Sequence, residues 1–332
     1  MTRPLTILTW HVHGSYLWYL SHIPHLVCLP VKPGRPAGYG GALPGFPWPG
    51  KVREIPADQV RRLQFDCVIY QSRTNWQEDR FEILSPAQRR LPRIFLEHDP
   101  PRSSPTDTRH FVDDAGTLLV HVTPFNALMW DSGRTPTRVI EHGAVLPAHV
   151  RYTGELARGI VVVNHLRERG RRLGADVFTR ARERVPLDLV GMKSGELGGL
   201  GEIGHGALPA FVARYRFLFS PVRYTSLGLA VCEAMHAGVP VVGLATTEMA
   251  TAIENGISGF VDTRLEILVA RMRTLLADPA LAARLGQGAR RTARARFGIE
   301  RFVRDWNDAL AEVTGIAVPA AESVPGDMPA HA

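Results

Sequence analysis

Short apolar runs recur along the chain, and each ends at a glycine, a proline or a cluster of polar residues, as buried strands do. Segments with helical spacing lie between several of these runs, for example at 75–90. Strands that alternate with helices predict an α/β protein with parallel sheets and crossover helices. The predicted strands are 5–10, 25–30, 65–70, 93–98, 117–123, 159–163, 187–191, 217–219 and 240–243.

The clearest strand–helix–strand unit lies within residues 216–263. A strand at 217–219 is followed by a polar loop, a helix over 227–235 and a strand over 240–243, and Gly238 is placed to end the helix. The loop would lie at the carboxyl end of a parallel strand, where open α/β sheets bind ligands. The helix start offers unpaired N–H groups and a positive dipole end, which suit a phosphate group.

Length and composition favour two ordinary globular domains. The chain has 332 residues, of which 45% are hydrophobic and 21% are charged. No apolar run approaches the length that crosses a bilayer. The N-terminal residues lead directly into a strand and lack the apolar core of a signal peptide, so a cytoplasmic location is predicted. Three scattered cysteines fit buried thiols in a reducing compartment.

The net charge is +7, which suits nucleic acid, an anionic membrane or a phosphorylated small molecule. The arginines are spread out and no nucleic-acid-binding module is present, so no nucleic-acid partner is predicted. His11 and His13 alternate in an extended segment, but no third ligand follows at a useful spacing. No metal site is therefore predicted.

The stretch from 221 to 260 resembles the sugar-nucleotide donor site of glycosyltransferase family 4, whose members have the GT-B fold. The family pattern has a glutamate where this chain has Thr225 and a phenylalanine where it has Leu227. Residues 253–260 match the segment that follows in the family. The matching residues before that segment are Pro221, Gly228, Glu233, Ala234, Met235, Gly238, Pro240, Val241 and Val242.

The resemblance implies a GT-B fold, in which two Rossmann-like, doubly wound domains face each other across a cleft. The expected divisions are an acceptor domain over 1–145, a donor domain over 146–300 and a helix over 301–314 that returns to the first domain. Residues 315–332 are expected to form a disordered tail, because they are rich in alanine and proline.

The resemblance also implies roles for particular residues. His98 would contact the donor sugar, although a bond to its neighbours Glu97 or Asp99 is an alternative. Arginines in a loop over 164–174 would hold the donor diphosphate, with Arg169 and Arg172 acting in catalysis; a basic solvated loop is the alternative. Glu233 would accept bonds from the ribose or interact with its helix dipole. The other expected donor-binding residues are Gly14, Arg167, Arg171, Gly204, Thr225, Ser226, Leu227 and Gly228.

The activity implied is transfer of a sugar from a nucleotide diphosphate sugar to a glycan, lipid or other acceptor, with retention of configuration and without a metal or cofactor. Polysaccharide biosynthesis is a typical context. Because Thr225 replaces a carboxylate, a catalytically impaired nucleotide-sugar-binding protein is the alternative. An epimerase would need a carboxylate and histidine set that the sequence does not assemble.

Gly14 fits a donor-facing turn or a plain strand-to-helix turn.

The Gly/Pro-rich segment 32–50 is predicted to be a long loop. Basic and aromatic residues together suit a membrane interface, so weak attachment to the anionic inner face of a membrane is predicted. A solvated loop whose rings pack on the domain is the alternative. The residues concerned, in and next to the loop, are Lys32, Arg35, Phe46, Trp48, Lys51 and Arg53.

Overall fold

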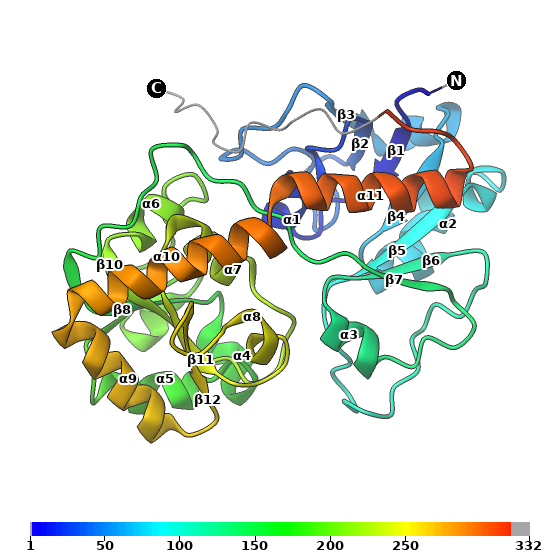
Figure 1. Cartoon of the computed structure of the whole chain (residues 1–332). Helices are drawn as coiled ribbons and strands as arrows, with labels where there is room; N and C mark the ends of the chain where they lie inside the picture. The colour runs from blue at the N-terminus through cyan, green and yellow to red at the C-terminus, as the bar shows by residue number, and fades with distance from the viewer. Residues whose placement is uncertain (1, 320–332) are drawn as a thin grey trace. The chain divides into compact units, whose positions relative to one another are not determined.

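The computed structural model describes residues 2–319, which form two compact units (Figure 1). Among the described residues, the first unit comprises 2–143 and 299–319, and the second comprises 144–298. Each unit contains its own parallel sheet. The predicted disordered tail, 315–332, lies outside the described residues from position 320 onward.

The sheet of the first unit has the strand order β3-β2-β1-β4-β5-β6-β7, and all neighbours pair in parallel. The order reverses between β1 and β4, which makes this the switch point of the sheet. Apolar residues of β1, β4, β5 and β6 are buried between the layers. The strands are β1 (Thr6–Thr9), β2 (Leu26–Val31), β3 (Val52–Pro56), β4 (Cys67–Tyr70), β5 (Arg93–Glu97), β6 (Leu118–His121) and β7 (Thr137–Val139).

The helices of the first unit are α1 (Gly14–Leu20), α2 (Arg80–Ile83), α3 (Pro124–Met129) and α11 (Ile299–Thr314). Although α11 is the last helix among the described residues, it lies beside α1 (Figure 1). Its Trp306 Nε1 donates to the Tyr16 hydroxyl of α1 at 3.2 Å. A Cβ atom on Gly143 would lie 2.2 Å from Cβ of Phe302. The final helix thus packs tightly within the first unit.

Two elements of the first unit differ from the sequence prediction. The single helix predicted over 75–90 is a π-helical turn, η2 (Asn75–Asp79), followed by α2 and a 3-10 turn, η3 (Gln88–Arg90). The Ser85-Pro86 pair interrupts the helix, because proline lacks an N–H donor. Strand β3 is not among the predicted strands, since it lies at the sheet edge and buries only Ile55.

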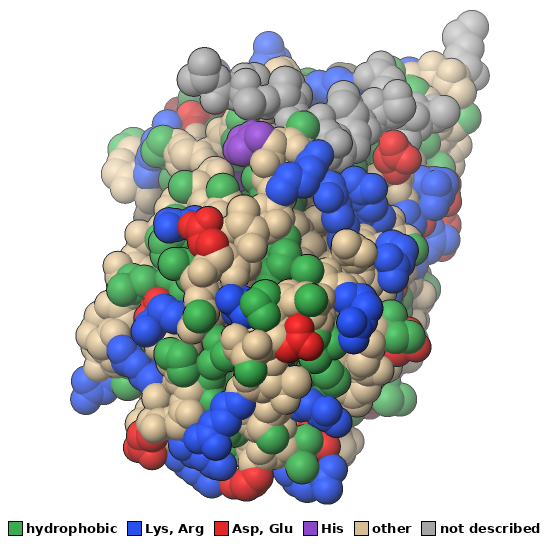
Figure 2. Space-filling view, turned by 60° about the vertical axis from the view of Figure 1, so that its left-hand side comes forward, with side chains coloured by type: hydrophobic (Ala, Val, Ile, Leu, Met, Phe, Trp, Pro, Cys, Tyr) green, Lys and Arg blue, Asp and Glu red, His purple; other side chains and the backbone are tan. Residues whose placement is uncertain are grey.

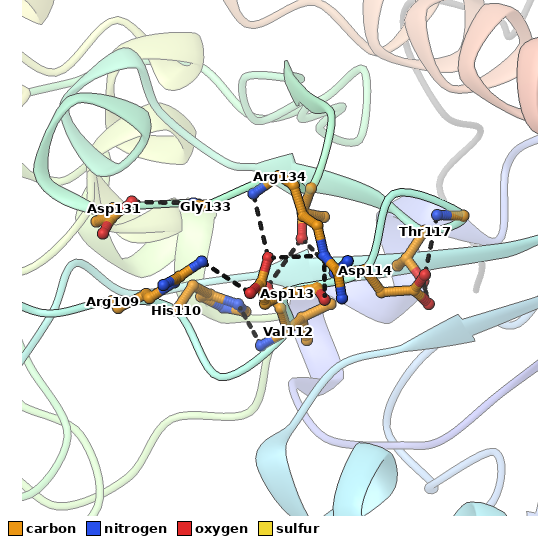
Figure 3. A network of polar contacts seen from close by, with 11 residues as sticks. Arg109, His110, Val112, Asp113, Asp114, Thr117, Asp131, Gly133 and Arg134 are labelled. Carbon is orange, nitrogen blue, oxygen red and sulfur yellow. Dashed lines mark hydrogen bonds and ion pairs between the residues drawn. The ribbon is translucent and has the colours of Figure 1, made fainter.

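Ion pairs hold the long connection between β5 and β6, which begins at His98. Arg93 donates to Asp114 at 2.7 Å, and Arg109 donates to Asp113 at 2.7 Å (Figure 3). Partial burial opposes ionisation of Asp114, but its bonds from Arg93, the Gly116 N–H and Thr117 lower the pKa of this carboxyl to about 2. The ion pair of Arg93 with Asp114 therefore fixes the end of this connection to the start of β5.

The sheet of the second unit has the parallel order β12-β11-β10-β8-β9, which reverses between β8 and β10. Its core lies between this sheet and the surrounding helices. The strands are β8 (Leu156–Val162), β9 (Leu187–Val190), β10 (Tyr215–Ser220), β11 (Val241–Leu244) and β12 (Gly259–Asp262). The helices are α4 (Leu166–Leu173), α5 (Ala175–Arg182), α6 (Leu208–Val212), α7 (Leu229–Ala237), α8 (Met249–Ala252), α9 (Leu265–Ala277) and α10 (Pro279–Arg296).

The segment after β8 is largely helical, whereas the sequence analysis expects a loop over 164–174. Leucine, arginine and glutamate favour a helix, and α4 forms from them with a break at Gly170. At Gly174, between α4 and α5, the backbone has φ +81°, and an added Cβ would lie 1.9 Å from the carbonyl oxygen of Pro221. Only glycine permits this close contact between the α4–α5 junction and the end of β10.

Across residues 2–319, every helix is either too short or too polar to span a membrane.

We expect Gly174→Ala to destabilise the protein more than Gly256→Ala. Both glycines have positive φ, at +81° and +78°, so both substitutions carry the cost of a left-handed conformation, about 1–2 kcal/mol. Gly256 has no heavy atom within 4 Å of an added Cβ, whereas Gly174 faces the Pro221 carbonyl. The free energy of unfolding from urea titration should fall about 1–3 kcal/mol further for Gly174→Ala. Equal losses would show that the contact with Pro221 is not tight.

Candidate functional site

Two segments meet at the switch point of the second sheet: the one that follows β8 and the one that follows β10. The backbone N–H groups of Arg223 and Tyr224 donate to the carbonyl of Arg172 at 3.0 and 3.1 Å. Both segments leave the carboxyl ends of adjacent parallel strands. The arginine-rich segment and the loop before α7, which the sequence analysis singles out separately, therefore form one surface at the position where α/β sheets bind ligands.

A partly buried ion pair between Arg223 and Asp176, which the sequence does not predict, holds this surface together. Arg223 forms a two-pronged bond to Asp176, with its Nη2 2.7 Å from Oδ2, and its Nη1 also donates to the Arg171 carbonyl at 2.7 Å. The bond from Arg223 lowers the pKa of Asp176 to about 2, so the carboxylate is charged at neutral pH. The two residues lie 47 positions apart in the chain, and no local pattern links them.

The predicted phosphate-binding arginines belong to α4. Arg167 and Arg171 are exposed, whereas Arg169 and Arg172 are half-buried. Arg171, with a side chain 78% exposed, lies 2.8 Å from Asp176. The helix begins after His165, which has a left-handed φ of +54°. Such backbone strain in a non-glycine residue is commonly associated with functional sites.

The start of α7 is suited to an anion. Gly228 is the N-cap in an extended conformation and has no side chain to cap the helix, and the first turn contains no acidic residue. The helix dipole and the N–H groups of the first turn therefore favour a negative ligand. Leu227 is buried beneath this end, while Thr225 and Ser226 are half-buried in the preceding loop.

Glu233 and His205 face each other further along α7. Glu233 is only 5% exposed, and its Oε1 lies 3.9 Å from Nδ1 of His205 in the loop before α6. Burial lowers the pKa of His205 to about 4, so its ring is neutral at neutral pH. An added Cβ at Gly204 would meet no atom within 4 Å. A neutral imidazole beside a carboxylate offers both a donor and acceptors to a polar ligand.

His98 and Gly14 lie in the first unit. His98 follows β5, and its ring centroid is 4.1 Å from that of His13 and 4.9 Å from that of Tyr16. Burial, and then the neighbouring His13 and His142, lower the pKa of His98 well below its usual range. Gly14 is the first residue of α1, and an added Cβ there would lie 3.2 Å from Nε2 of His11. A side chain at Gly14 would therefore be close to His11, and the donor-binding role of Gly14 stays a prediction.

The predicted donor residues of the second unit lie on α4, in the loop before α6, in the loop after β10 and on α7. In the first unit, Gly14 and His98 follow the carboxyl ends of β1 and β5. Among residues 2–319, no group of three or more histidine, cysteine, aspartate or glutamate side chains is arranged to hold a metal ion.

Sequence comparison identifies relatives of the second unit. Residues 195–292 match the family model of glycosyl transferases group 1. A D-inositol 3-phosphate glycosyltransferase of Salinispora arenicola (strain CNS-205) is 38% identical over 115 residues, which cover 34% of this chain and 25% of that protein. The enzyme of the same name from Salinispora tropica is 36% identical over 107 residues, or 32% of this chain and 22% of that protein. The match thus spans about a quarter of the length of these curated relatives.

Structure comparison extends the likeness to both sheets. Sucrose-phosphate synthase from Thermosynechococcus elongatus has a TM-score of 0.67 at 16% identity, covering 94% of this chain and 99% of the other. HepE of Anabaena in complex with UDP-glucose also has a TM-score of 0.67 at 16% identity, covering 93% and 100%. This protein therefore has the GT-B fold, and its second unit contains a segment of the glycosyl transferases group 1 type.

Proposed function

We propose that the protein is a family 4 glycosyltransferase that moves a sugar from a nucleotide diphosphate sugar to a glycan, lipid or other acceptor, with retention of configuration and without a metal or cofactor. The observation that carries this proposal is the pair of backbone bonds that joins the end of arginine-rich α4 to the loop leading into α7, at the switch point of the second sheet. This surface includes part of the segment that matches the glycosyl transferases group 1 family.

The chemistry needs stabilisation of a departing diphosphate. As the bond between the anomeric carbon and the phosphate oxygen breaks, negative charge grows on the diphosphate, and fixed arginines and helix N–H groups stabilise it. Arg169 and Arg172 are the proposed cations. In the scheme implied for family 4, a donor phosphate oxygen takes the proton of the acceptor hydroxyl as the new glycosidic bond forms. No protein side chain then has to act as a strong base.

Several observations favour a uridine nucleotide as the first donor to test. HepE, which shares the fold, was solved with UDP-glucose, and structures of TarM and of pneumococcal GtfA were solved with UDP. Glu233 would accept bonds from the ribose, with His205 beside it. Thr225 would face the sugar with a neutral hydroxyl instead of a carboxylate. Polysaccharide biosynthesis remains the proposed context.

The second candidate function is nucleotide-sugar binding without catalysis, in a partner or sensor protein. Its support is Thr225, since a carboxylate is expected at this position in family 4. The two functions differ in one measurement: release of UDP from UDP-sugars in the presence of candidate acceptors. Turnover favours the transferase, whereas binding without turnover across a broad panel of acceptors favours the impaired protein.

The net positive charge of the protein lies in the second unit. Residues 144–298 contain 21 Lys and Arg against 13 Asp and Glu, while the rest of the chain contains 18 against 19. Figure 2 brings forward the side that carries α9 and α10, and basic side chains outnumber acidic ones there. In the first unit, Lys32 and Arg35 are paired with Glu82 and Glu54 at 2.7 and 2.8 Å. The proposed membrane attachment through loop 32–50 would therefore be weak.

We expect a nucleoside diphosphate to raise the melting temperature of the protein. UDP, GDP and ADP should each be tested at millimolar concentration. Arg169→Ala and Arg172→Ala should each weaken binding by about 1.5–3 kcal/mol if the lost bond is to phosphate. Arg180→Ala on α5 is the matched control, since its guanidinium lies 3.7 Å from Glu266 instead. The absence of a shift with all three nucleotides would refute the donor site.

We expect Glu233 and Thr225 to affect different parts of the donor. Glu233→Gln keeps the shape of the side chain but loses the charged acceptor, so affinity for the bare nucleotide should fall by about 1–2 kcal/mol. Thr225→Glu should change the preference among nucleotide sugars and leave affinity for the bare nucleotide unchanged. Calorimetric titration of both variants with UDP and UDP-glucose gives the comparison. Equal effects of Thr225→Glu on both ligands would show that residue 225 does not face the sugar.

We expect sedimentation with anionic vesicles to decrease as salt rises, because exposed charges are screened. The double variant Lys51→Gln/Arg53→Gln tests the first unit, and Arg291→Gln/Arg294→Gln on α10 provides the comparison in the second. The first variant should reduce binding more. Binding that depends only on the α10 arginines, or that is equal on neutral vesicles, would contradict the proposed attachment through loop 32–50.

A further inference from the structure

A buried glutamine occupies the switch point of the first sheet. Gln71 directly follows β4, is 4% exposed, and reaches across to the end of β1, the neighbour at which the strand order reverses. Its Nε2 donates to Thr9 Oγ1 and to the Trp10 carbonyl, each at 2.9 Å. Its Oε1 lies 3.2 Å from Nε2 of His98. The amide therefore links two strand ends to the predicted sugar-contacting histidine.

The bonding partners determine which way the amide points. The Trp10 carbonyl can only accept a hydrogen bond, and the Thr9 hydroxyl uses its single hydrogen on the carbonyl of Ile69 at 2.9 Å. Both partners thus require a donor from Gln71. The opposite orientation would place the amide oxygen against a carbonyl oxygen. The nitrogen must therefore face β1, and the oxygen must face His98.

This orientation in turn determines the tautomer of His98. The amide oxygen can only accept, so Nε2 of His98 must carry the hydrogen that it donates to Gln71. In a neutral imidazole the other nitrogen, Nδ1, then has a lone pair and no hydrogen. Burial together with His13 and His142 disfavours the charged ring, as described above. The described residues supply no hydrogen-bond partner for this Nδ1, and the side chain is only partly buried.

We propose that Gln71 is a positioning residue that holds His98 as the Nε2–H tautomer, so that Nδ1 serves as an acceptor for one hydroxyl group of a sugar or polyol ligand. The tautomer follows from the contacts of Gln71 alone. The identity of the hydroxyl, as one belonging to a sugar substrate, rests on the proposed function.

This assignment makes the chemistry of His98 directional. Nδ1 without a hydrogen can accept a hydrogen bond from a hydroxyl but cannot donate one. A carboxylate or carbonyl oxygen of the ligand at that position would place its lone pair against the lone pair of Nδ1, and the two would repel each other. A deoxy ligand leaves the lone pair unmatched. Selection for a hydroxyl at one ligand position is the expected consequence. At this position the ligand hydroxyl is therefore the hydrogen-bond donor and His98 the acceptor.

The direct test is nitrogen NMR of the full-length protein labelled with 15N-histidine. Two-bond proton–nitrogen correlations distinguish the two neutral tautomers, and His98→Gln identifies the signals of His98 by their loss. At pH 7 the wild-type spectrum should show His98 with hydrogen on Nε2. A wild-type spectrum with hydrogen on Nδ1 would overturn the proposal, and this outcome does not depend on any variant folding or on any activity.

A pair of variants separates positioning from general destabilisation. Gln71→Met removes the acceptor for Nε2, so the His98 signals should shift to a mixture of tautomers. Gln88→Met is the control, because Gln88 is also buried, at 7% exposure, and donates to the carbonyls of Val60 and Leu63 within the same unit. The control should leave the His98 signals unchanged. A folded Gln71→Met protein with the wild-type His98 tautomer would contradict the positioning role.

Kinetics then tests the hydroxyl. If transfer is observed, the ratio of kcat/KM between a sugar donor or acceptor and its deoxy analogues should be largest at one hydroxyl, and Gln71→Met should reduce that ratio about tenfold, as expected for about 1.4 kcal/mol. Gln88→Met should leave the ratio unchanged. If no transfer occurs, the proposed function fails while the NMR result still decides the tautomer. Transfer with a ratio unaffected by Gln71→Met would refute the role in hydroxyl recognition.

Discussion

The candidate donor surface depends on one close backbone contact. Gly174 and the carbonyl of Pro221 approach so closely that no side chain fits between them, and the N–H groups of Arg223 and Tyr224 add two bonds to Arg172. These contacts join the end of α4 to the loop that precedes α7. Without them, the arginines and the helix start would be separate features of two loops. With them, cations and N–H groups are presented from adjacent strand ends.

An ion pair stabilises this contact but also reduces the positive charge of the surface. Asp176 is shared between Arg223 and Arg171, so part of the positive charge near the surface is already neutralised by the protein. The bidentate bond to Arg223 fixes the loop, whereas the exposed pair with Arg171 contributes little, as surface ion pairs generally do. Arg169 and Arg172, which lie deeper on α4, are then the better candidates for holding a diphosphate. Position on the surface thus distinguishes the structural Arg223 from the arginines that we propose to bind a diphosphate.

Sequence reasoning predicts the second sheet well where the signal is local. The apolar run at 217–219, the helix start near 227 and Gly238 at its end predict β10, α7 and the turn before β11, and the structure has all three. The same reasoning misses α4, because a run of arginines with an internal glycine reads as a loop. It also misses β3, whose edge position leaves almost no apolar pattern.

The contacts that organise the candidate sites are beyond local reasoning for a physical reason. Asp176 and Arg223, or Gln71 and His98, are partners only because parallel strands bring distant residues to the same sheet edge. Periodicity reports which residues are buried, but it carries no information on which polar groups meet.

The two switch points have different chemistry, and the difference follows from what surrounds them. In the second unit, the edge carries arginines and an uncapped helix start, which suit a charged group. In the first, the edge carries buried amides, hydroxyls and imidazoles whose burial favours the neutral form. A neutral edge of this kind suits hydroxyl groups, because recognition there depends on the direction of each donor and acceptor. One chain therefore contains two parallel sheets of different strand order, each with a switch point, and supplies charge at one and hydrogen-bond polarity at the other.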